Sequence, residues 1–438
     1  MRIFSWYFKS SLLLRILAGL ILGAVCGIIF GPKIAWVHPF GEIFIRLLKM
    51  IVLPVIVFTL TTGAASVHPA QLGRVGVKAL VIYLITTAFA VTLGLICGNV
   101  FQPGQGMKLT GAAGEAAKMD ITSPSLIDTL INIVPNNPYG AIAEGHILPV
   151  IFFCLIFGIG LAYVRNSDDE GIRKSGETLF RFFNGSAEVI YLVVHWVLQY
   201  APIGVFALIA EVFGKQGAEA FGPLGITTLA VYIAFMAQMG LIYGGILTVF
   251  KISPLAFFNK AKEAIVTAFV TRSSGGTLPV SMDIAGSKMG ISKGVYSFSL
   301  PLGATINMDG TAIYQGVCAV FVGFAIGTPL TLSQQMAIIT TAVLASIGTA
   351  GVPGAGAIML MMVLDSVGLK IENGTPVAMA YAMIFGIDAL LDMGRTACNV
   401  AGDLAVTCVV AKSEGEMDQS LWVQEEKSTG RLVESVAE

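Results

Sequence analysis

The sequence predicts an all-α integral membrane protein, and three observations support this fold class. Charged residues make up 12% of the 438 residues, about half of the ~25% found in soluble domains. Hydrophobic residues make up 55%, and the mean hydropathy is +0.81. Long stretches such as Ala220–Phe250 and Gly310–Leu364 carry no charge, and each exceeds the ~20 apolar residues with which a helix crosses a bilayer. Such a composition excludes a soluble globular protein, a disordered chain and a basic protein that binds nucleic acid.

The first 250 residues are predicted to hold six ordinary membrane-spanning helices. Their approximate limits are residues 12–30, 40–66, 79–101, 147–165, 189–213 and 224–250. The first could be confused with a signal peptide, but its apolar run is long and lacks a small-x-small cleavage site. The connection 102–146 is rich in Gly, Ala and Pro, with room for short helices around Pro135–Pro138.

The basic residues set the orientation of these helices. With the N-terminus inside, the connections on the cytoplasmic side carry twelve Lys and Arg residues, and those on the outside carry four. This bias satisfies the positive-inside rule. The charged end, residues 412–438, is predicted to be a solvated cytosolic tail. We therefore expect a multi-pass protein of the cell (cytoplasmic) membrane with both termini in the cytoplasm.

After residue 251 the apolar segments are interrupted by small polar clusters. The three clusters are Thr271–Pro279, Asn307–Thr311 and Ser346–Gly356. The first and third share Ser-x-Gly-Thr followed by Pro, which is a weak internal repeat. The arms beside these two are too short to cross a bilayer alone, so re-entrant hairpins fit better than kinked helices. Irregular backbone at membrane depth is tolerated only inside protein or along a wet cavity, and paired interrupted segments mark a transporter's binding site.

The last predicted span, residues 376–411, carries a polar stripe. Its members are Asp388, Asp392, Arg395, Thr396, Asn399 and Asp403. At about 100° per residue they fall within about 100° of arc on one helix face. Each buried charge costs at least ~2.5–3.5 kcal/mol in a membrane, so the stripe needs partners, and its excess charge is negative.

The chemistry of the stripe indicates ligands. An Arg guanidinium binds a carboxylate in bidentate fashion, and a nearby Asp can hold an ammonium group. The remaining carboxylates suit a hard cation such as Na⁺. Together they predict a site for a zwitterion with an extra acid group, beside cations; the alternative is a set of salt bridges that only joins helices. No phosphate-binding loop of the G-x-x-x-x-G-K-[ST] type is present, so an ion gradient is the expected energy source.

These motifs resemble the dicarboxylate/amino acid:cation symporter family, the glutamate transporter family. It includes archaeal sodium–aspartate symporters and the vertebrate excitatory amino acid transporters. The segments that carry the resemblance are Arg272–Pro279, Asn307–Thr311, Gly348–Ala357 and Asp388–Asp403. The resemblance covers about residues 12–413 and is closest to the prokaryotic sodium–aspartate symporters. It implies eight transmembrane helices plus two re-entrant helical hairpins, built from inverted repeats, in an elevator-type transporter.

The resemblance also implies a division of the chain. Residues 1–75 and 103–219 would form a scaffold that holds a homotrimer. Residues 76–102 and 220–412 would form a transport part that slides through the bilayer, with the second hairpin as its gate. Residues 413–438 would be the cytoplasmic tail.

The resemblance further implies roles for individual residues. Arg395 would bind the side-chain carboxylate of an acidic amino acid together with Thr311, and Asp392 would bind the amino group. The other implied substrate residues are Ser273, Ser274, Thr396 and Asn399 near the α-carboxylate, Val352 and Gly356 in the gate, and Arg272 and Asp388, which would pair or line the empty site.

Co-transported Na⁺ ions are implied at three places. The first set is Asp403 with the carbonyls of Gly303, Asn307 and Asn399. The second set is the carbonyls of Thr305, Ser346, Ile347 and Thr349, near the sulfur of Met308. The third set is Tyr83, Thr86, Thr87, Asn307 and Asp309. Two positions depart from relatives. Gly275 stands where many carry a serine, and Gln315 stands where vertebrate members carry a glutamate linked to proton coupling.

The sequence therefore predicts a sodium-coupled symporter of L-aspartate and/or L-glutamate, with D-aspartate as a further substrate. The near alternative is a proton-coupled glutamate or C4-dicarboxylate symporter, and a different class is an ion channel. An intramembrane hydrolase using Ser274 lacks a base, so no enzyme is expected. Aspartate and glutamate have the same charged ends, so the sequence does not separate them.

Overall fold

The computed structural model describes most of the chain as helices. The described residues are 12–66, 74–107, 109, 131, 134–144, 146–217, 221–346, 349, 351, 353–372 and 374–422. Within these residues the only β pairing is a single bridge between Ile291 and Met417. In this part of the chain six helices are long and apolar enough to cross a membrane, so the predicted all-α class with several membrane-spanning helices is confirmed. The count of eight spans and the inverted repeats stay predictions.

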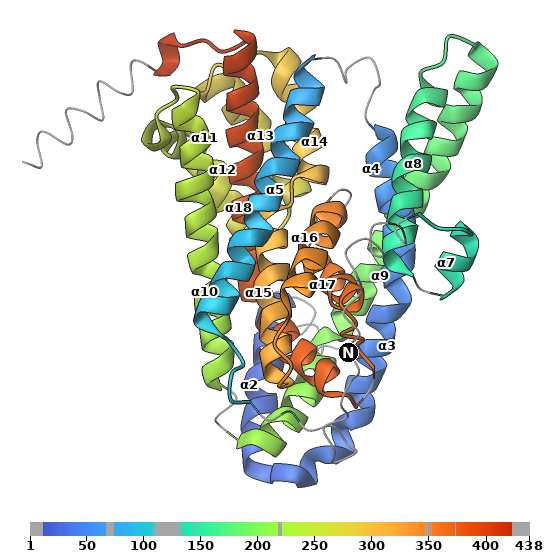
Figure 1. Cartoon of the computed structure of the whole chain (residues 1–438), viewed down its shortest axis with the longest axis vertical. Helices are drawn as coiled ribbons and strands as arrows, with labels where there is room; N and C mark the ends of the chain where they lie inside the picture. The colour runs from blue at the N-terminus through green and yellow to red at the C-terminus, as the bar shows by residue number, and fades with distance from the viewer. Residues whose placement is uncertain are drawn as a thin grey trace, which may run out of the picture.

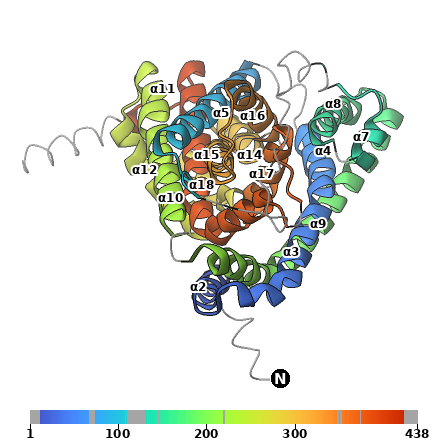
Figure 2. The same ribbon diagram turned by 60° about the horizontal axis from the view of Figure 1, so that its bottom comes forward.

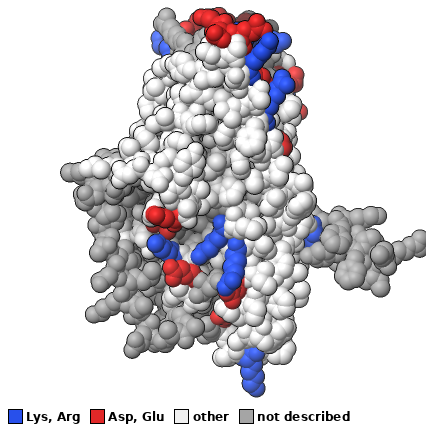
Figure 3. Space-filling view, turned by 90° about the vertical axis from the view of Figure 1, so that its right-hand side faces the viewer, with Lys and Arg blue, Asp and Glu red and all other residues white. Residues whose placement is uncertain are grey.

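The first group of helices forms a curved arm along one side of the molecule (Figure 2). It comprises α2 (Leu12–Phe30), η1 (Gly31–Val37), α3 (His38–Val55), the π-helical turn η2 (Ile56–Leu60), α4 (Thr61–Ser66), α7 (Pro138–Glu144), α8 (Ile147–Arg165) and α9 (Glu170–Gln216). The long helix α9 packs against α2, α3 and α8 and so holds the arm together. On the face that carries α8, charged side chains gather at the upper end and in a second group in the lower half, with an uncharged area between the two (Figure 3).

The second group forms a thick bundle beside the arm (Figure 1). It comprises α5 (Arg74–Phe101), α10 (Phe221–Ala237), the π-helical turn η4 (Gln238–Tyr243), α11 (Gly244–Val249), α12 (Pro254–Thr271), α13 (Ser274–Asp283), the π-helical turn η5 (Ile284–Lys288), α14 (Lys293–Ile306), α15 (Asp309–Ala325), α16 (Leu332–Ser346), α17 (Ala355–Ser366) and α18 (Pro376–Glu414). Helices α15 and α18 lie at its centre, and nearly all of their side chains are buried.

The predicted spans agree closely with these helices, with one clear difference. The fifth span was expected over 189–213, but α9 begins at Glu170, where the Asp169 side chain accepts a hydrogen bond from the backbone N–H of Ile172. The first turns of α9 carry charged residues, so a count of apolar residues misses them. A helix cap, and not the loss of apolar residues, sets where this helix begins.

Each of the three polar clusters interrupts the helices. In the first, α12 ends at Arg272, whose φ of 55° is left-handed, and α13 begins at once and packs back against α12. In the third, α16 and α17 also pack against each other, and Gly354 precedes α17 with a φ of 81°. The chain therefore reverses at both clusters, as a hairpin requires and a kinked helix does not. In the second, the helix breaks between α14 and α15 without reversing.

Small residues let the central helices approach closely. A methyl group at Gly94 of α5 would collide with the backbone carbonyl of Ile313 in α15, and one at Gly316 would lie 2.9 Å from the carbonyl oxygen of Val91. Close backbone contact of this kind drives helix association in membranes, where apolar side chains gain little by leaving lipid. These glycines therefore set the spacing of α5 and α15.

The sequence predicts that residues 412–438 form a solvated tail, but the first part of this segment packs against the bundle. Helix α18 continues to Glu414, whose side chain pairs with Lys78 of α5. Residues beyond it fold back on the loop after η5, where the indole of Trp422 donates to the carbonyl of Met289 at 2.8 Å. Trp422 is only 8% exposed. Contact with the bundle therefore orders the residues that follow Glu414, and the amino-acid composition of that segment does not indicate this contact.

Replacing Gly94 by Ala is expected to destabilise the protein by about 1–3 kcal/mol, because the added methyl group forces α5 away from α15. The thermal unfolding midpoint of the purified protein in detergent measures this. Gly160→Ala is the matched control, since nothing lies within 4 Å of the added methyl group. Equal midpoints for the two variants would contradict the close-packing argument.

Candidate functional site

The polar stripe of α18 lies buried against the middle of the bundle. Asp388, Asp392, Arg395, Asn399 and Asp403 are each at most 5% exposed. They face the break between α14 and α15 and the two hairpin tips. Because no bulk water reaches them, each charge must find its partner inside the protein.

Arg395 forms the centre of an ion-paired group. Its Nη2 donates to Oδ1 of Asp392 at 2.6 Å, and its Nε donates to the same oxygen at 3.2 Å. Its Nη1 donates to Oδ1 of Asp388 at 3.2 Å. Two acidic side chains therefore share one guanidinium, so this group has one more acidic than basic residue.

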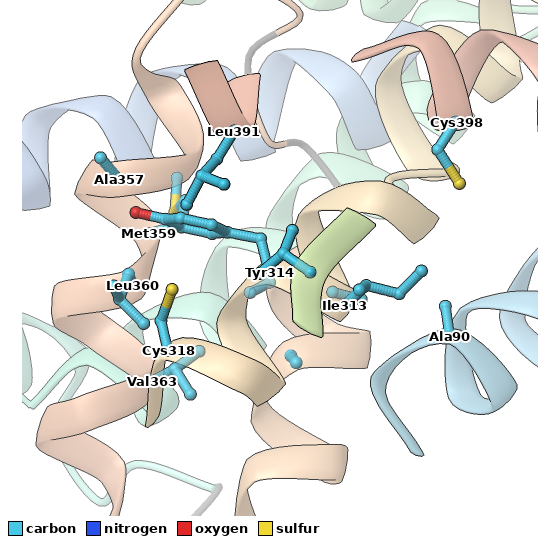
Figure 4. Packing of buried hydrophobic residues seen from close by; sticks show 14 of the residues in the cluster. Ala90, Ile313, Tyr314, Cys318, Ala357, Met359, Leu360, Val363, Leu391 and Cys398 are labelled. Atoms are coloured by element: carbon cyan, nitrogen blue, oxygen red, sulfur yellow. The ribbon is translucent and has the colours of Figure 1, made fainter. Parts of the chain in front are cut away.

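Two neighbours fix the plane of that guanidinium. The ring of Tyr314 lies 4.6 Å from the guanidinium carbon of Arg395, a cation–π contact. Tyr314 itself is wedged among apolar residues of α15, α17 and α18, including Leu360 and Leu391 (Figure 4). On another side, a methyl group at Gly356 would collide with the guanidinium, so a larger residue there would displace it from its present position.

The two hairpin tips touch each other beside this group. The Ser273 hydroxyl donates to the carbonyl of Gly351 at 2.8 Å and accepts from the N–H of Gly276 at 3.0 Å. The N–H of Gly354 donates to Oδ2 of Asp392 at 3.2 Å. The second tip thus closes over Asp392, the carboxylate that is predicted to bind the amino group of the substrate.

A cavity of about 10 Å³ remains among these residues, room for no more than about one water molecule. Its lining is Arg272, Ser274, Met308, Thr311, Thr349, Gly351, Gly356, Asp392, Arg395, Thr396 and Asn399. The structure thus brings most of the predicted substrate residues together around one small space. Asp388 and Arg272 line a neighbouring cavity of about 20 Å³. No ion pair joins those two in the described part of the chain, since Asp388 pairs with Arg395 instead.

A second buried carboxylate, Asp309, begins α15. Its Oδ1 accepts from the Thr87 hydroxyl at 2.6 Å, and its Oδ2 accepts from Tyr243 at 2.8 Å and from Gln238 at 3.1 Å. All of these partners are neutral. The predicted neighbour Thr86 contacts Oδ1 of Asn307 at 3.4 Å.

Asp403 is held in a similar way. Its Oδ1 accepts from Nδ2 of Asn307 at 3.0 Å, and a methyl group at Gly303 would lie 2.6 Å from that same oxygen and 2.7 Å from the hydroxyl of Tyr83. Among the described residues, neither Asp403 nor Asp309 forms an ion pair with Lys, Arg or His. A buried carboxylate without a cationic partner is costly, and an incoming cation would relieve that cost.

Asn399 links the substrate side of the cluster to the cation side. Its Oδ1 accepts from the N–H of Gly310 at 2.7 Å, and its Nδ2 contacts the sulfur of Met308 at 3.1 Å. Met308 and Thr349 also line the cavity. The residues predicted to bind substrate and those predicted to bind cations are therefore contiguous.

The remaining predicted ligands are placed less distinctly. The hydroxyls of Thr305, Ser346 and Thr349 donate to backbone carbonyls of their own segments. These three residues and Ile347 are predicted to bind the second cation through their backbone carbonyls. Ile347 and Val352 lie outside the described residues. In the described chain, no group of three or more His, Cys, Asp or Glu could hold a metal ion.

Sequence reasoning missed three residues of this site. Gln238 and Tyr243 of η4 bond to Asp309, and Tyr314 lies under Arg395. One signal could have found Gln238, because it is the single amide in the charge-free run Ala220–Phe250. Polar side chains inside membrane segments are usually functional.

Comparison with known proteins agrees with this geometry. Residues 12–413 match the sodium:dicarboxylate symporter family. The proton/sodium-glutamate symport protein of Bacillus caldotenax is 35% identical over 421 residues, which cover 94% of this chain and 96% of the relative. The proton/glutamate-aspartate symporter of Escherichia coli is 33% identical and covers 94% of both chains. C4-dicarboxylate transport protein 1 of Bradyrhizobium is 32% identical, over 94% of this chain and 92% of the relative.

These matches run through every helix described above, including both hairpins and the polar stripe. They make the chain a multi-pass membrane transporter and not an enzyme. The protein belongs to the sodium:dicarboxylate symporter family.

Proposed function

We propose that this protein is a sodium-coupled symporter of acidic amino acids, L-aspartate and/or L-glutamate, that also accepts D-aspartate. Relatives over nearly the whole chain are named as symporters of glutamate, of glutamate and aspartate, or of C4-dicarboxylates. The family therefore limits the substrate to an acidic compound carried with a cation. The choice within that range rests on the buried pair of Arg395 and Asp392.

The pair of Arg395 and Asp392 favours an amino acid because separating the two side chains exposes one positive and one negative group to the ligand. A ligand carboxylate that takes the place of Asp392 on the guanidinium leaves the Asp392 carboxylate free. An ammonium group on the same ligand then pairs with it, so no buried charge is left alone. A dicarboxylate without an amine would leave Asp392 unpaired, and removing one partner of a buried pair costs about 3–5 kcal/mol.

The remaining contacts follow from the cavity lining. Thr311 lies beside Arg395 for the side-chain carboxylate, and Thr396, Asn399 and Ser274 offer polar atoms to the α-carboxylate. Because the cavity is too small for an amino acid, entry requires the Gly354 N–H to leave Asp392 and the second hairpin to open. That motion makes the second hairpin the gate.

Sodium is the proposed coupling ion because two buried carboxylates, Asp309 and Asp403, have only neutral partners. Carboxylate, amide, hydroxyl and carbonyl oxygens surround both, which is the ligand set that hard cations prefer. One ion would bind at Asp403 and a second at Asp309, and a third would bind at the base of the second hairpin. Ions at these places would neutralise the excess negative charge of the loaded site.

The two packed groups of helices support an elevator movement within a homotrimer. The arm would be the scaffold and the bundle the moving part, with α5 joined to α18 by the Lys78–Glu414 pair. Leu12 and Ile16 of α2 line the cavity that borders both hairpin tips. With the N-terminus in the cytoplasm, this arrangement corresponds to a transport part displaced toward the cytoplasm.

A proton-coupled glutamate or C4-dicarboxylate symporter is the second candidate, favoured by the names of several relatives. Gln315 argues against proton coupling. It is buried, its Nε2 has no partner among the described residues, and an amide does not exchange a proton near neutral pH.

Proteoliposomes loaded without sodium are expected to accumulate labelled aspartate only when sodium is added outside. The energy comes from sodium moving down its gradient into the vesicles, after it has bound at Asp309 and Asp403. A proton gradient in sodium-free buffer is the control condition. Accumulation driven by protons alone would refute sodium coupling, and efficient competition by succinate would favour the dicarboxylate alternative.

Arg395→Cys is expected to abolish transport of acidic amino acids and to permit uptake of small neutral ones, because the partner of the side-chain carboxylate is lost. Arg46→Cys is the matched control, since Arg46 is exposed and pairs with Glu42 on its own helix. Uptake of labelled aspartate and serine measures both variants. Unchanged aspartate affinity in Arg395→Cys would refute the assignment.

Asp392→Asn is expected to weaken aspartate binding by about 100-fold or more, the equivalent of losing one buried charge partner. Succinate, which has no amine, should lose much less. Equilibrium competition against labelled aspartate gives both affinities, and the exposed Asp283→Asn on α13 is the control. Equal losses for the two ligands would show that Asp392 does not bind the amine.

A further inference from the structure

Two buried side chains of η4 bond to Asp309 without belonging to any of the cation sites implied by the family resemblance. Gln238 and Tyr243 are both 0% exposed. They come from the helix that covers α5 and α18 on the outside of the bundle. Burying these polar side chains costs free energy that a leucine would not cost, so their presence indicates a role beyond packing.

The backbone of η4 is shaped to bring these two side chains together. In an α-helix, residues five apart point about 140° away from each other, at about 100° per residue. Gln238–Tyr243 is instead a π-helical turn, in which the hydrogen bond runs between residues five apart and so stacks them on one face. Both side chains therefore reach the same oxygen, Oδ2 of Asp309. Such π turns are found frequently at functional sites.

The amide of Gln238 lies between two oxygens that a cation would use. Its Nε2 donates to Oδ2 of Asp309 at 3.1 Å and to the backbone carbonyl of Thr86 at 3.2 Å. Its Oε1 is buried and has no hydrogen-bond partner among the described residues. The opposite orientation would place Oε1 against the carboxylate, acceptor against acceptor, so the empty site holds the amide as it is.

Tyr243 is the fixed member of the pair. Its hydroxyl donates to Oδ2 of Asp309 at 2.8 Å, and a methyl group at Gly402 of α18 would lie 2.5 Å from that hydroxyl oxygen. The phenol is thus enclosed and cannot turn away. The Gln238 amide is different, because rotation about its terminal torsion exchanges N and O without moving the helix.

We propose that the Gln238 amide takes the place of a sodium ion at Asp309 when the site is empty and rotates to become a ligand when the ion arrives. The donor NH₂ group then leaves the carboxylate, and Oε1 turns to the cation. This inference rests on the proposed sodium coupling. It makes Gln238 a determinant of cation affinity, while Tyr243 holds the carboxylate in both states.

The test measures sodium binding without transport. The purified full-length protein, free of substrate, is unfolded thermally at fixed pH in sodium chloride or choline chloride of equal ionic strength, and the sodium dependence of the midpoint gives the apparent affinity. Gln238→Leu removes the amide, and Gln238→Glu keeps the side-chain oxygen and replaces the NH₂ donor by a second oxygen. Tyr232→Phe is the control, since that hydroxyl, on the neighbouring α10, donates to the Leu390 carbonyl away from Asp309.

The expected result is a loss of sodium affinity of about 10- to 100-fold in Gln238→Leu, with affinity kept or raised in Gln238→Glu and unchanged in Tyr232→Phe. Wild-type affinity in Gln238→Leu overturns the proposal. A loss in both Gln238 variants also overturns it, because the side chain would then act only as a structural donor. If Gln238→Leu does not fold, Gln238→Asn, which withdraws the amide by one methylene, is expected to show the loss.

The same measurement separates this inference from the proposed function. A wild-type protein that sodium does not stabilise relative to choline would overturn sodium coupling and the role of Gln238 together. Sodium stabilisation in the wild type, with wild-type affinity in Gln238→Leu, would leave sodium coupling intact and overturn the inference alone.

Discussion

The buried pairing of Arg395 with Asp388 and Asp392 is the interaction on which the rest of the bundle depends. A guanidinium in a membrane helix is tolerated only with partners, and the fold supplies them from one face of α18. The same requirement explains the close glycine at position 356 and the aromatic ring of Tyr314. The hairpin tips meet beside this group, and the second tip bonds to Asp392. In the proposed function, the carboxylate and amine of a ligand would exchange these contacts for equivalent ones.

The carboxylates of the proposed cation sites also need partners inside the protein, but their partners are neutral groups. Asp309 and Asp403 receive hydrogen bonds from neutral groups and no cationic side chain of the described residues. Neutral donors stabilise a carboxylate partly, so these positions remain attractive to a mobile cation, whereas a lysine would fill them permanently. Asn399 and Met308 touch both sides. Occupation of one side can thereby change the energy of the other through direct contacts.

Much of this could be predicted because membrane insertion imposes strict local rules. A span of apolar residues between basic loops must be a helix, so 12–30, 147–165 and 376–411 were located within a few residues. The beginning of α9 at Glu170 and the docking of Trp422 were missed. The first depends on a cap in a charged segment, and the second depends on a surface built from distant parts of the chain. Neither leaves a hydropathy signal.

The sequence by itself determined the class of protein, the polar stripe and the interruptions, because charge inside an apolar run has few physical explanations. Tertiary structure alone decided how those groups are paired. Only the packed bundle shows that Arg395 is shared by two carboxylates, that Gly354 closes on Asp392, and that a π-helical turn aims Gln238 and Tyr243 at Asp309. Pairing depends on distances between helices far apart in the chain. Those distances are set by close packing at glycines and by backbone irregularities, neither of which periodicity encodes.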